Sequence, residues 1–230
     1  MLRLFALLYF VGGDIMPRGS ITMQVANFQQ LLADIRAIED TGKKAISNTV
    51  KDVKSRAPGW IASEVVKVYN IRKGEVTPST SSNRMAGSLR IAGETLETLT
   101  FTYEGRLLTP VHFGMTPKSP PKGKNYTLKM QVLKGRKEII GRYKNKRTKG
   151  GPFSERSHNI LMGTGNQREG GVNWIPFQRM SKRRTDLKVF KTISMPQMIT
   201  SERTQENILA KLNEETGKRL QHNLDRALGK

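Results

Sequence analysis

The sequence predicts an α+β fold: long helices near the N-terminus, a central and mostly antiparallel β-sheet with long basic loops, and an amphipathic helix at the C-terminus. Apolar residues recur every three or four positions at both ends of the chain, but alternate with polar residues in short runs in the middle. Hydrophobic residues make up 36% of the 230 positions, below the usual value of roughly 45–50%. We therefore expect a modest core and an extensive polar surface.

The first helical pattern begins at Phe28, and its apolar residues keep helical spacing as far as Ala57. The sequence Ala57-Pro58-Gly59 is expected to end this helix, because a proline disfavours helical geometry in the residue before it. A second, shorter helix is predicted from Trp60 to Tyr69. Both helices belong to the N-terminal part of the fold.

The strand-rich centre follows a polar run, residues 77–84, which predicts a loop. Residues 88–92 and 96–103 are short β-rich runs joined at 93–94, and they predict a hairpin. Because side chains alternate along a strand, one face of its second strand is expected to carry Leu99, Phe101 and Tyr103.

A second hairpin is predicted from residues 126–133 and 138–140, with a turn at 134–137. Residues 117–124, which precede this hairpin, contain a Pro-Pro sequence and a glycine and are not expected to continue a sheet. Residues 142–171 predict a long loop with at most a brief strand at its only apolar run, 160–162. The last strands are predicted at 172–177 and 187–193.

The C-terminal helix is predicted to hold Pro196 in its first turn. Its apolar face is expected to comprise Ile208, Leu209, Leu212, Thr216, Leu220, Leu224, Ala227 and Leu228. We predict one domain over residues 23–230, preceded by an extension, residues 1–22. That extension is either a mis-annotated start, since Met16 and Met23 follow, or a weak signal-like segment too short to span a membrane.

The charge is strongly unbalanced: 40 Lys and Arg face 19 Asp and Glu, for a net charge of +21. Residues 118–149 contain twelve cations and one acid, and residues 179–191 contain six and one. Such an excess repels itself unless a polyanion or an acidic protein surface balances it. The candidate partner- or DNA-contact residues are Lys134, Arg136, Lys137, Arg142, Lys144, Lys146, Arg147, Lys149, Arg179, Lys182, Arg183 and Arg184.

Catalytic and metal-binding patterns are not predicted. The chain has no cysteine, and its three histidines, His112, His158 and His222, lack partners at metal-site spacing. The glycine-rich run at 163–171 places Gly171 and Val172 where a phosphate-binding loop needs a lysine and a hydroxyl. We therefore expect no enzyme activity, no cofactor and no metal.

The order of segments at the C-terminus carries a family resemblance. A basic strand at 187–190 is followed by Ser194-Met195-Pro196-Gln197-Met198 and then by a long closing helix. This order resembles the minor tail protein Z family of lambda-like phages, also called tail-completion protein Z. The N-terminal half is similar too, with a helix at 57–70, a basic segment at 71–76 and a first strand at 87–91. Residues 139–142 fall where the family has an Ile-Pro-Gly-Ala-Phe-like segment.

The resemblance implies a structural virion protein of the tail, present in the host cytoplasm during assembly. It would act at the head-proximal end of the tail and make the tail competent for head–tail joining. Its partners would be other tail or head–tail connector proteins, with no membrane involved. A homo-oligomeric ring and a monomer that becomes ordered on docking both stay open.

A second hypothesis is a sequence-independent nucleic-acid-binding protein of a mobile element, in which the basic loops neutralise phosphates. Tyr126 and Tyr143 lie among the cations of residues 118–149 and could stack on bases. A nuclease is the least favoured hypothesis, because the strand-rich centre has only isolated acids to hold a metal.

Overall fold

The computed structural model describes residues 18–22, 39–77, 88–122, 124–143, 160–164, 174–180 and 186–229. It contains long helices and small antiparallel sheets, which confirms the α+β prediction. The single domain expected over 23–230 stays a prediction, and within the chain the backbone contacts group into two compact units. Unit 1 comprises Met1–Val66, Lys73–Arg106 and Ser194–Lys230, and unit 2 comprises Lys67–Arg72 and Leu107–Ile193.

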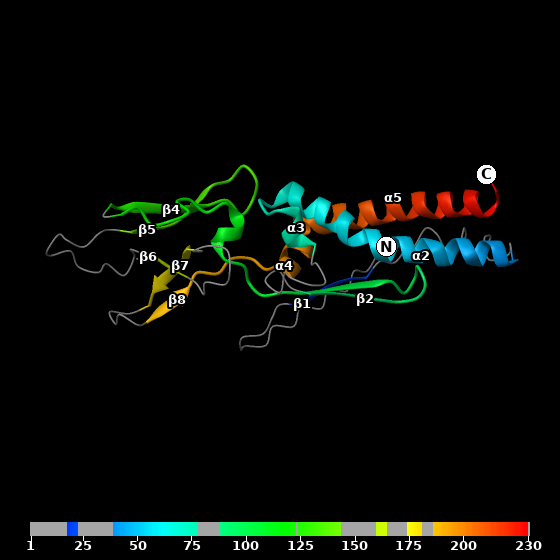
Figure 1. Ribbon diagram of the computed structural model, residues 1–230, viewed down its shortest axis with the longest axis horizontal. Helices are drawn as coiled ribbons and strands as arrows, with labels where there is room; N and C mark the ends of the chain where they lie inside the picture. The colour runs from blue at the N-terminus through cyan, green and yellow to red at the C-terminus, as the bar shows by residue number, and fades with distance from the viewer. Residues whose placement is uncertain are drawn as a thin grey trace. The chain divides into compact units, whose positions relative to one another are not determined.

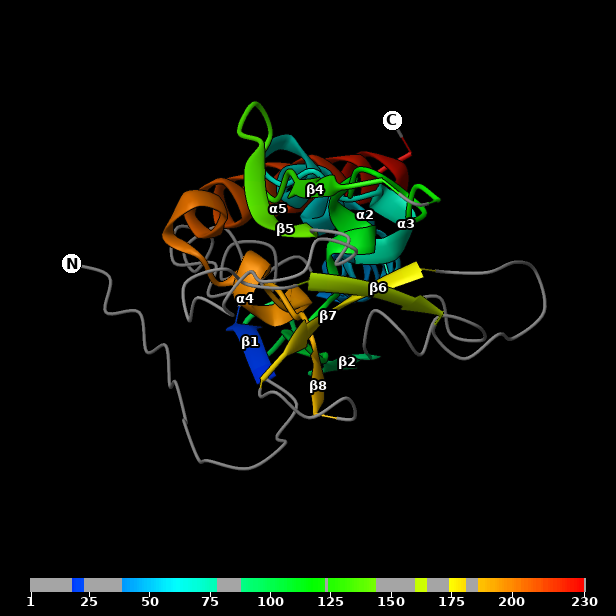
Figure 2. The same ribbon diagram turned by 90° about the vertical axis from the view of Figure 1, so that its left-hand side faces the viewer.

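Two long helices dominate unit 1, α2 (Glu39–Val68) and α5 (Glu202–Ala227). They lie side by side and run in opposite directions (Figure 1), and Figure 2 shows the same pairing from another side. The Asn223 side-chain amide of α5 donates hydrogen bonds to Thr49 Oγ1 at 3.1 Å and Asp52 Oδ2 at 3.2 Å on α2. Since Thr49 and Asn223 are both buried, this contact fixes which turns of the two helices meet.

The predicted helix break at 57–59 is wrong, because α2 continues through Pro58 and Gly59. Val53, Ala57, Ile61 and Val65 are all completely buried at four-residue spacing, so one apolar stripe runs across the proline. An interior proline costs a helix about 3 kcal/mol. Burial of the residues on both sides of Pro58 offsets that cost. The helix predicted from Phe28 to Ala57 is confirmed from Glu39 onward, and its first part, residues 28–38, lies outside the described residues.

The sheet of unit 1 has the order β1-β3-β2, with all strands antiparallel. Its strands are β1 (Arg18–Thr22), β2 (Ser88–Ala92) and β3 (Thr100–Glu104). The predicted hairpin is confirmed, and so is the buried face formed by Leu99, Phe101 and Tyr103. Strand β3 starts at Thr100 rather than at Leu96, because residues 96–98 belong to the turn. Leu96 is buried within that turn. Strand β1 lies inside the segment predicted to be an extension.

The C-terminal segment forms two helices where one was predicted. Helix α4 (Met195–Ile199) begins with a capping box: Ser194 Oγ accepts from Gln197 N, and Gln197 Oε1 accepts from Ser194 N. The chain turns at Thr200, and Ser201 is the N-cap of α5. The predicted apolar face of α5 is confirmed by burial of Ile208, Leu212, Thr216 and Leu220. It is wrong at its end, since Ala227 and Leu228 are exposed at the end of the helix pair.

The described strands of unit 2 form two small antiparallel sheets. The first pairs β4 (Tyr126–Met130) with β5 (Glu138–Tyr143), and the second has the order β6-β7-β8. The second sheet comprises β6 (Ile160–Thr164), β7 (Trp174–Arg179) and β8 (Leu187–Val189). The predicted second hairpin, the brief strand near residue 160 and the last two strands are therefore confirmed, although β8 is shorter than predicted.

Both sheets of unit 2 contribute to one core of buried residues, formed by Met115, Leu128, Ile140 and Met162. Tyr126, Met130, Trp174 and Phe190 pack against it. The chain enters and leaves unit 2 at adjacent points, because Thr192 N donates to Leu108 O at 2.7 Å and Leu108 N donates to Ile193 O at 3.3 Å. Each unit contains one of the two tryptophans, Trp60 in unit 1 and Trp174 in unit 2.

Candidate functional site

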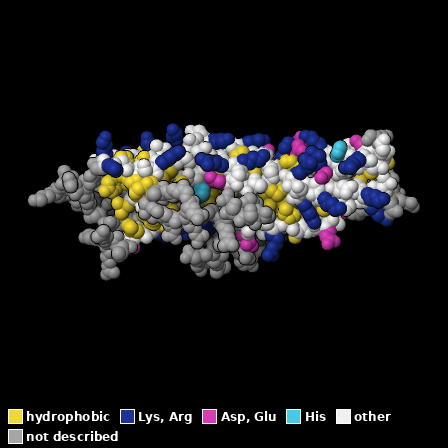
Figure 3. Space-filling view, in the orientation of Figure 1, with side chains coloured by type: hydrophobic (Ala, Val, Ile, Leu, Met, Phe, Trp, Pro, Cys, Tyr) yellow, Lys and Arg dark blue, Asp and Glu magenta, His cyan; other side chains and the backbone are white. Residues whose placement is uncertain are grey.

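The net charge lies almost entirely in unit 2. Its residues include 22 Lys and Arg against four Asp and Glu, a net charge of +18, whereas unit 1 has 18 against 15, a net charge of +3. On the face drawn in Figure 3, Lys and Arg side chains are widely spread and Asp and Glu are few. A polyanion or an acidic protein surface is therefore attracted more strongly to unit 2 than to unit 1.

Four of the predicted contact residues lie in the hairpin β4–β5 or its turn: Lys134, Arg136, Lys137 and Arg142. All four are exposed. Arg179 ends β7, where only its backbone is described. The others lie outside the described residues: Lys144, Lys146, Arg147, Lys149, Lys182, Arg183 and Arg184. The site can therefore be built only on the hairpin.

The outward face of this hairpin carries two cations around an exposed isoleucine. Thr127 pairs with Arg142, and Lys129 pairs with Ile139. Residues paired across an antiparallel ladder share a face. Lys129 and Arg142 are exposed, and Ile139 is 56% exposed, the largest exposed fraction among the described large hydrophobic side chains. We call Lys129, Ile139 and Arg142 the hairpin face.

A β-bulge places Ile139 on this face. The register shifts between Leu128 and Lys129, so that Leu128 pairs with Gly141 while Lys129 pairs with Ile139. Without the extra residue, Ile139 would lie on the same face as Gly141, because side chains alternate along a strand. Instead Ile140 is buried and Ile139 is exposed. The sequence predicted the hairpin but contained no signal for the bulge, so it missed Lys129 and Ile139 as site residues.

The inward face of the hairpin carries its two tyrosines. Tyr126 and Tyr143 are cross-strand partners, and their rings stack with centroids 4.8 Å apart and planes 16° from parallel. Burial raises the pKa of Tyr126, while a hydrogen bond with the Met162 backbone opposes that rise. Each ring therefore has one face covered by the other ring, which leaves less aromatic surface for bases than the sequence predicted.

The turn of the hairpin is anchored by backbone hydrogen bonds to residues 68–70. Lys134 N donates to Val68 O at 2.9 Å, and Asn70 N donates to Val132 O at 2.8 Å. Gly135 allows the turn because its φ is +80°. Arg136 Nε lies 3.1 Å from the carboxylate of Glu138, the only acid between residues 118 and 149. The cations of this turn are thus attached to an anchored backbone.

The second hairpin of unit 2 also combines charge with exposed apolar side chains. Met180 N donates to Asp186 O at 3.0 Å and so holds the ends of β7 and β8 together. Met180 is 55% exposed and Leu187 is 41% exposed. Lys188 is exposed beside them in the chain. Both hairpins of unit 2 therefore present cations next to apolar surface.

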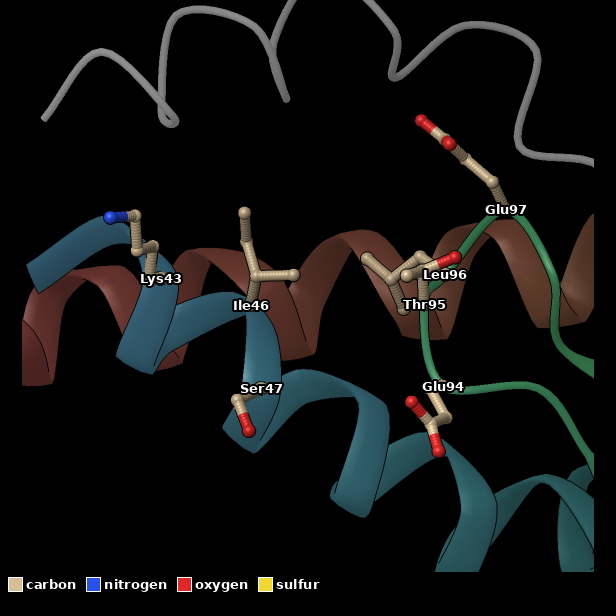
Figure 4. Close-up of a pocket in the computed structure, with 7 residues that line it drawn as sticks. All are labelled: Lys43, Ile46, Ser47, Glu94, Thr95, Leu96 and Glu97. Carbon is tan, nitrogen blue, oxygen red and sulfur yellow. The ribbon is translucent and has the colours of Figure 1, made fainter. Parts of the chain in front are cut away.

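A shallow pocket in unit 1 offers no chemistry of its own. It is lined by Lys43, Ile46 and Ser47 of α2 and by residues 94–97 of the turn after β2. Figure 4 shows that the Glu94 and Glu97 side chains point in different directions and do not converge on Lys43. Across the described part of the chain, no cluster of three or more His, Asp or Glu could hold a metal ion.

Two further findings concern membrane spans and similarity to known proteins. No helix within the described ranges is both long and apolar enough to span a membrane. Comparison with models of known protein families, with curated proteins and with solved structures found no match. The resemblance to the tail-completion family therefore rests on the sequence segments that carry it.

Proposed function

We propose that this protein is a structural tail-completion protein of a phage or prophage, which acts at the head-proximal end of the tail and makes it competent for head–tail joining. The observation that carries the proposal is the segregation of charge: unit 2 has a net charge of +18 and unit 1 has +3. The order of segments at the C-terminus, which resembles the tail-completion family, supplies the biological setting.

In this proposal the two units have different tasks. Unit 1 builds a folded body from the paired helices α2 and α5 and a three-stranded sheet. Unit 2 docks through its basic hairpins on an acidic surface of a tail or connector protein. Complementary charge would speed the encounter and disfavour basic partners. The protein would be present in the host cytoplasm during assembly and afterwards in the virion tail.

The test is electron microscopy of particles assembled with and without this gene product. The expected result without it is complete heads and complete tails that fail to join, and that join again when purified protein is added. Normal joining in its absence would overturn the proposal.

A sequence-independent nucleic-acid-binding protein is the second candidate, and the same charge of unit 2 favours it. Its prediction is binding to DNA of any sequence, with an affinity that falls steeply as salt is raised. The mutual stacking of Tyr126 and Tyr143 argues against a mode that depends on these rings. Salt-insensitive or absent DNA binding would remove this candidate.

A further inference from the structure

We infer that the hairpin face, Lys129, Ile139 and Arg142, is the centre of a docking surface for an acidic protein. The inference deepens the proposed function and rests on it for the identity of the partner, but its physical argument is separate. A docking site for an acidic protein must be exposed, ordered before binding and chemically suited to protein rather than to nucleic acid. The hairpin satisfies each condition.

The exposed side chain of Ile139 is the feature that favours a protein partner over a nucleic acid. Ile139 is 56% exposed and shares its face of the hairpin with two exposed cations, Lys129 and Arg142. The neighbouring Ile140 is buried. Protein interfaces commonly have an apolar centre and a polar or charged rim. Phosphates would bind Lys129 and Arg142 but gain nothing from Ile139. A partner that is acidic and carries an apolar spot would use all three side chains.

The surface is also preorganised. The opposite face of the hairpin packs on the core of unit 2 through Leu128 and the tyrosine pair. The turn is held by two backbone hydrogen bonds to residues 68–70. A surface that is ordered before binding loses little conformational freedom in the complex. Lys134 and Lys137, exposed in the turn, extend the positive rim.

Mutual stacking disfavours the nucleic-acid alternative at this face. The aromatic rings that could stack on bases lie on the inward side, each with one face against the other ring at a centroid distance of 4.8 Å. Single-stranded nucleic acid is usually bound by aromatic side chains that lie open beside a positive groove. The outward face offers cations and an aliphatic side chain only.

The decisive variant is Ile139→Lys, because it removes the apolar centre and adds positive charge. Docking on an acidic protein should weaken by about tenfold or more, as for a central interface residue. Binding to DNA should stay the same or strengthen. The charge-reversal variant Lys129→Glu/Arg142→Glu should weaken both. Val111→Lys is the matched control, since Val111 is also exposed in unit 2, at 39%, but lies outside the hairpin.

The partner is found first with the full-length protein in phage-producing cells, using a photo-crosslinking amino acid at position 139 and, as control, at position 111. We expect position 139 alone to crosslink to one protein with an acidic sequence. That protein is then purified, and its affinity is measured for the wild type, the two hairpin variants and the control. A short mixed-sequence DNA duplex serves as the nucleic-acid probe.

Several outcomes would overturn the inference: no protein crosslink at 139, a crosslink to DNA, or a purified partner that binds Ile139→Lys as tightly as wild type. If Ile139→Lys lowers the melting temperature, Ile139→Ser replaces it in the same comparison. The partner could also be an acidic protein that binds Ile139→Lys more weakly than wild type but is not a tail or connector protein. That result would support the docking surface and overturn only the proposed function.

Discussion

Gly93, in the turn between β2 and β3, has no room for a side chain. Its φ is +99°, and an added Cβ would lie 2.2 Å from the carbonyl oxygen of Thr98. Positive φ alone costs a non-glycine residue about 1–3 kcal/mol, and this backbone clash adds to that cost. We therefore expect Gly93→Ala to lower the free energy of unfolding by more than about 2 kcal/mol, measured by urea denaturation.

Gly59 provides the matched control, because it lies inside α2 and an added Cβ would meet no described atom within 4 Å. Replacing a helical glycine with alanine should stabilise the protein by about 0.5–1 kcal/mol. Equal effects of Gly93→Ala and Gly59→Ala would contradict the geometry of the β2–β3 turn.

Tyr103, on the buried face of β3, has a hydroxyl group without a hydrogen-bond partner among the residues that the structure describes. Burial raises the pKa of this phenol. An unsatisfied buried hydroxyl costs about 1–3 kcal/mol, whereas the ring contributes to the core. We expect Tyr103→Phe to leave the melting temperature unchanged or raise it. A clear loss of stability would mean that the hydroxyl has a partner in solution.

Replacement of Pro58 tests whether helix α2 is continuous. The ring of an interior proline removes one helical hydrogen bond and crowds the carbonyl four residues before it. Because α2 continues through Pro58, we expect Pro58→Ala to raise the free energy of unfolding by about 1–3 kcal/mol. Guanidinium denaturation followed by helical circular dichroism would measure it. Destabilisation by Pro58→Ala would show that α2 depends on the proline.

The elements that could be predicted are those whose signal is local. Alternation of apolar and polar residues predicted both hairpins. The continuity of α2 through Pro58 could not be predicted, because burial on both sides of the proline overrides a local preference. Strand β1 depends on pairing with β3, far away in the sequence. The hairpin face was missed for a similar reason, since the bulge at Ile140 appears only when β4 and β5 are paired.

At the scale of the whole molecule, the two units should differ in stability. Among the described residues, eight buried hydrophobic side chains lie in unit 2 and 18 in unit 1. Unit 2 also carries a charge of +18, whose self-repulsion opposes a compact state.

Hydrogen exchange on the full-length protein measures this difference. We expect backbone amides of β4, β5 and β7 to exchange faster than those of α2 and α5. Added salt should slow exchange in unit 2 more than in unit 1, because it screens the repulsion. Equal protection and equal salt response in the two units would contradict the prediction.

The placement of Trp60 and Trp174, one in each unit, means that the protein carries its own pair of optical reporters. Both indoles are half-buried, so their fluorescence should shift to longer wavelength as water reaches them. Trp60→Phe leaves only the emission of unit 2, and Trp174→Phe leaves only that of unit 1. If unit 2 is the weaker one, the Trp60→Phe protein will shift at a lower urea concentration, and unfolding of this chain will be seen as two events.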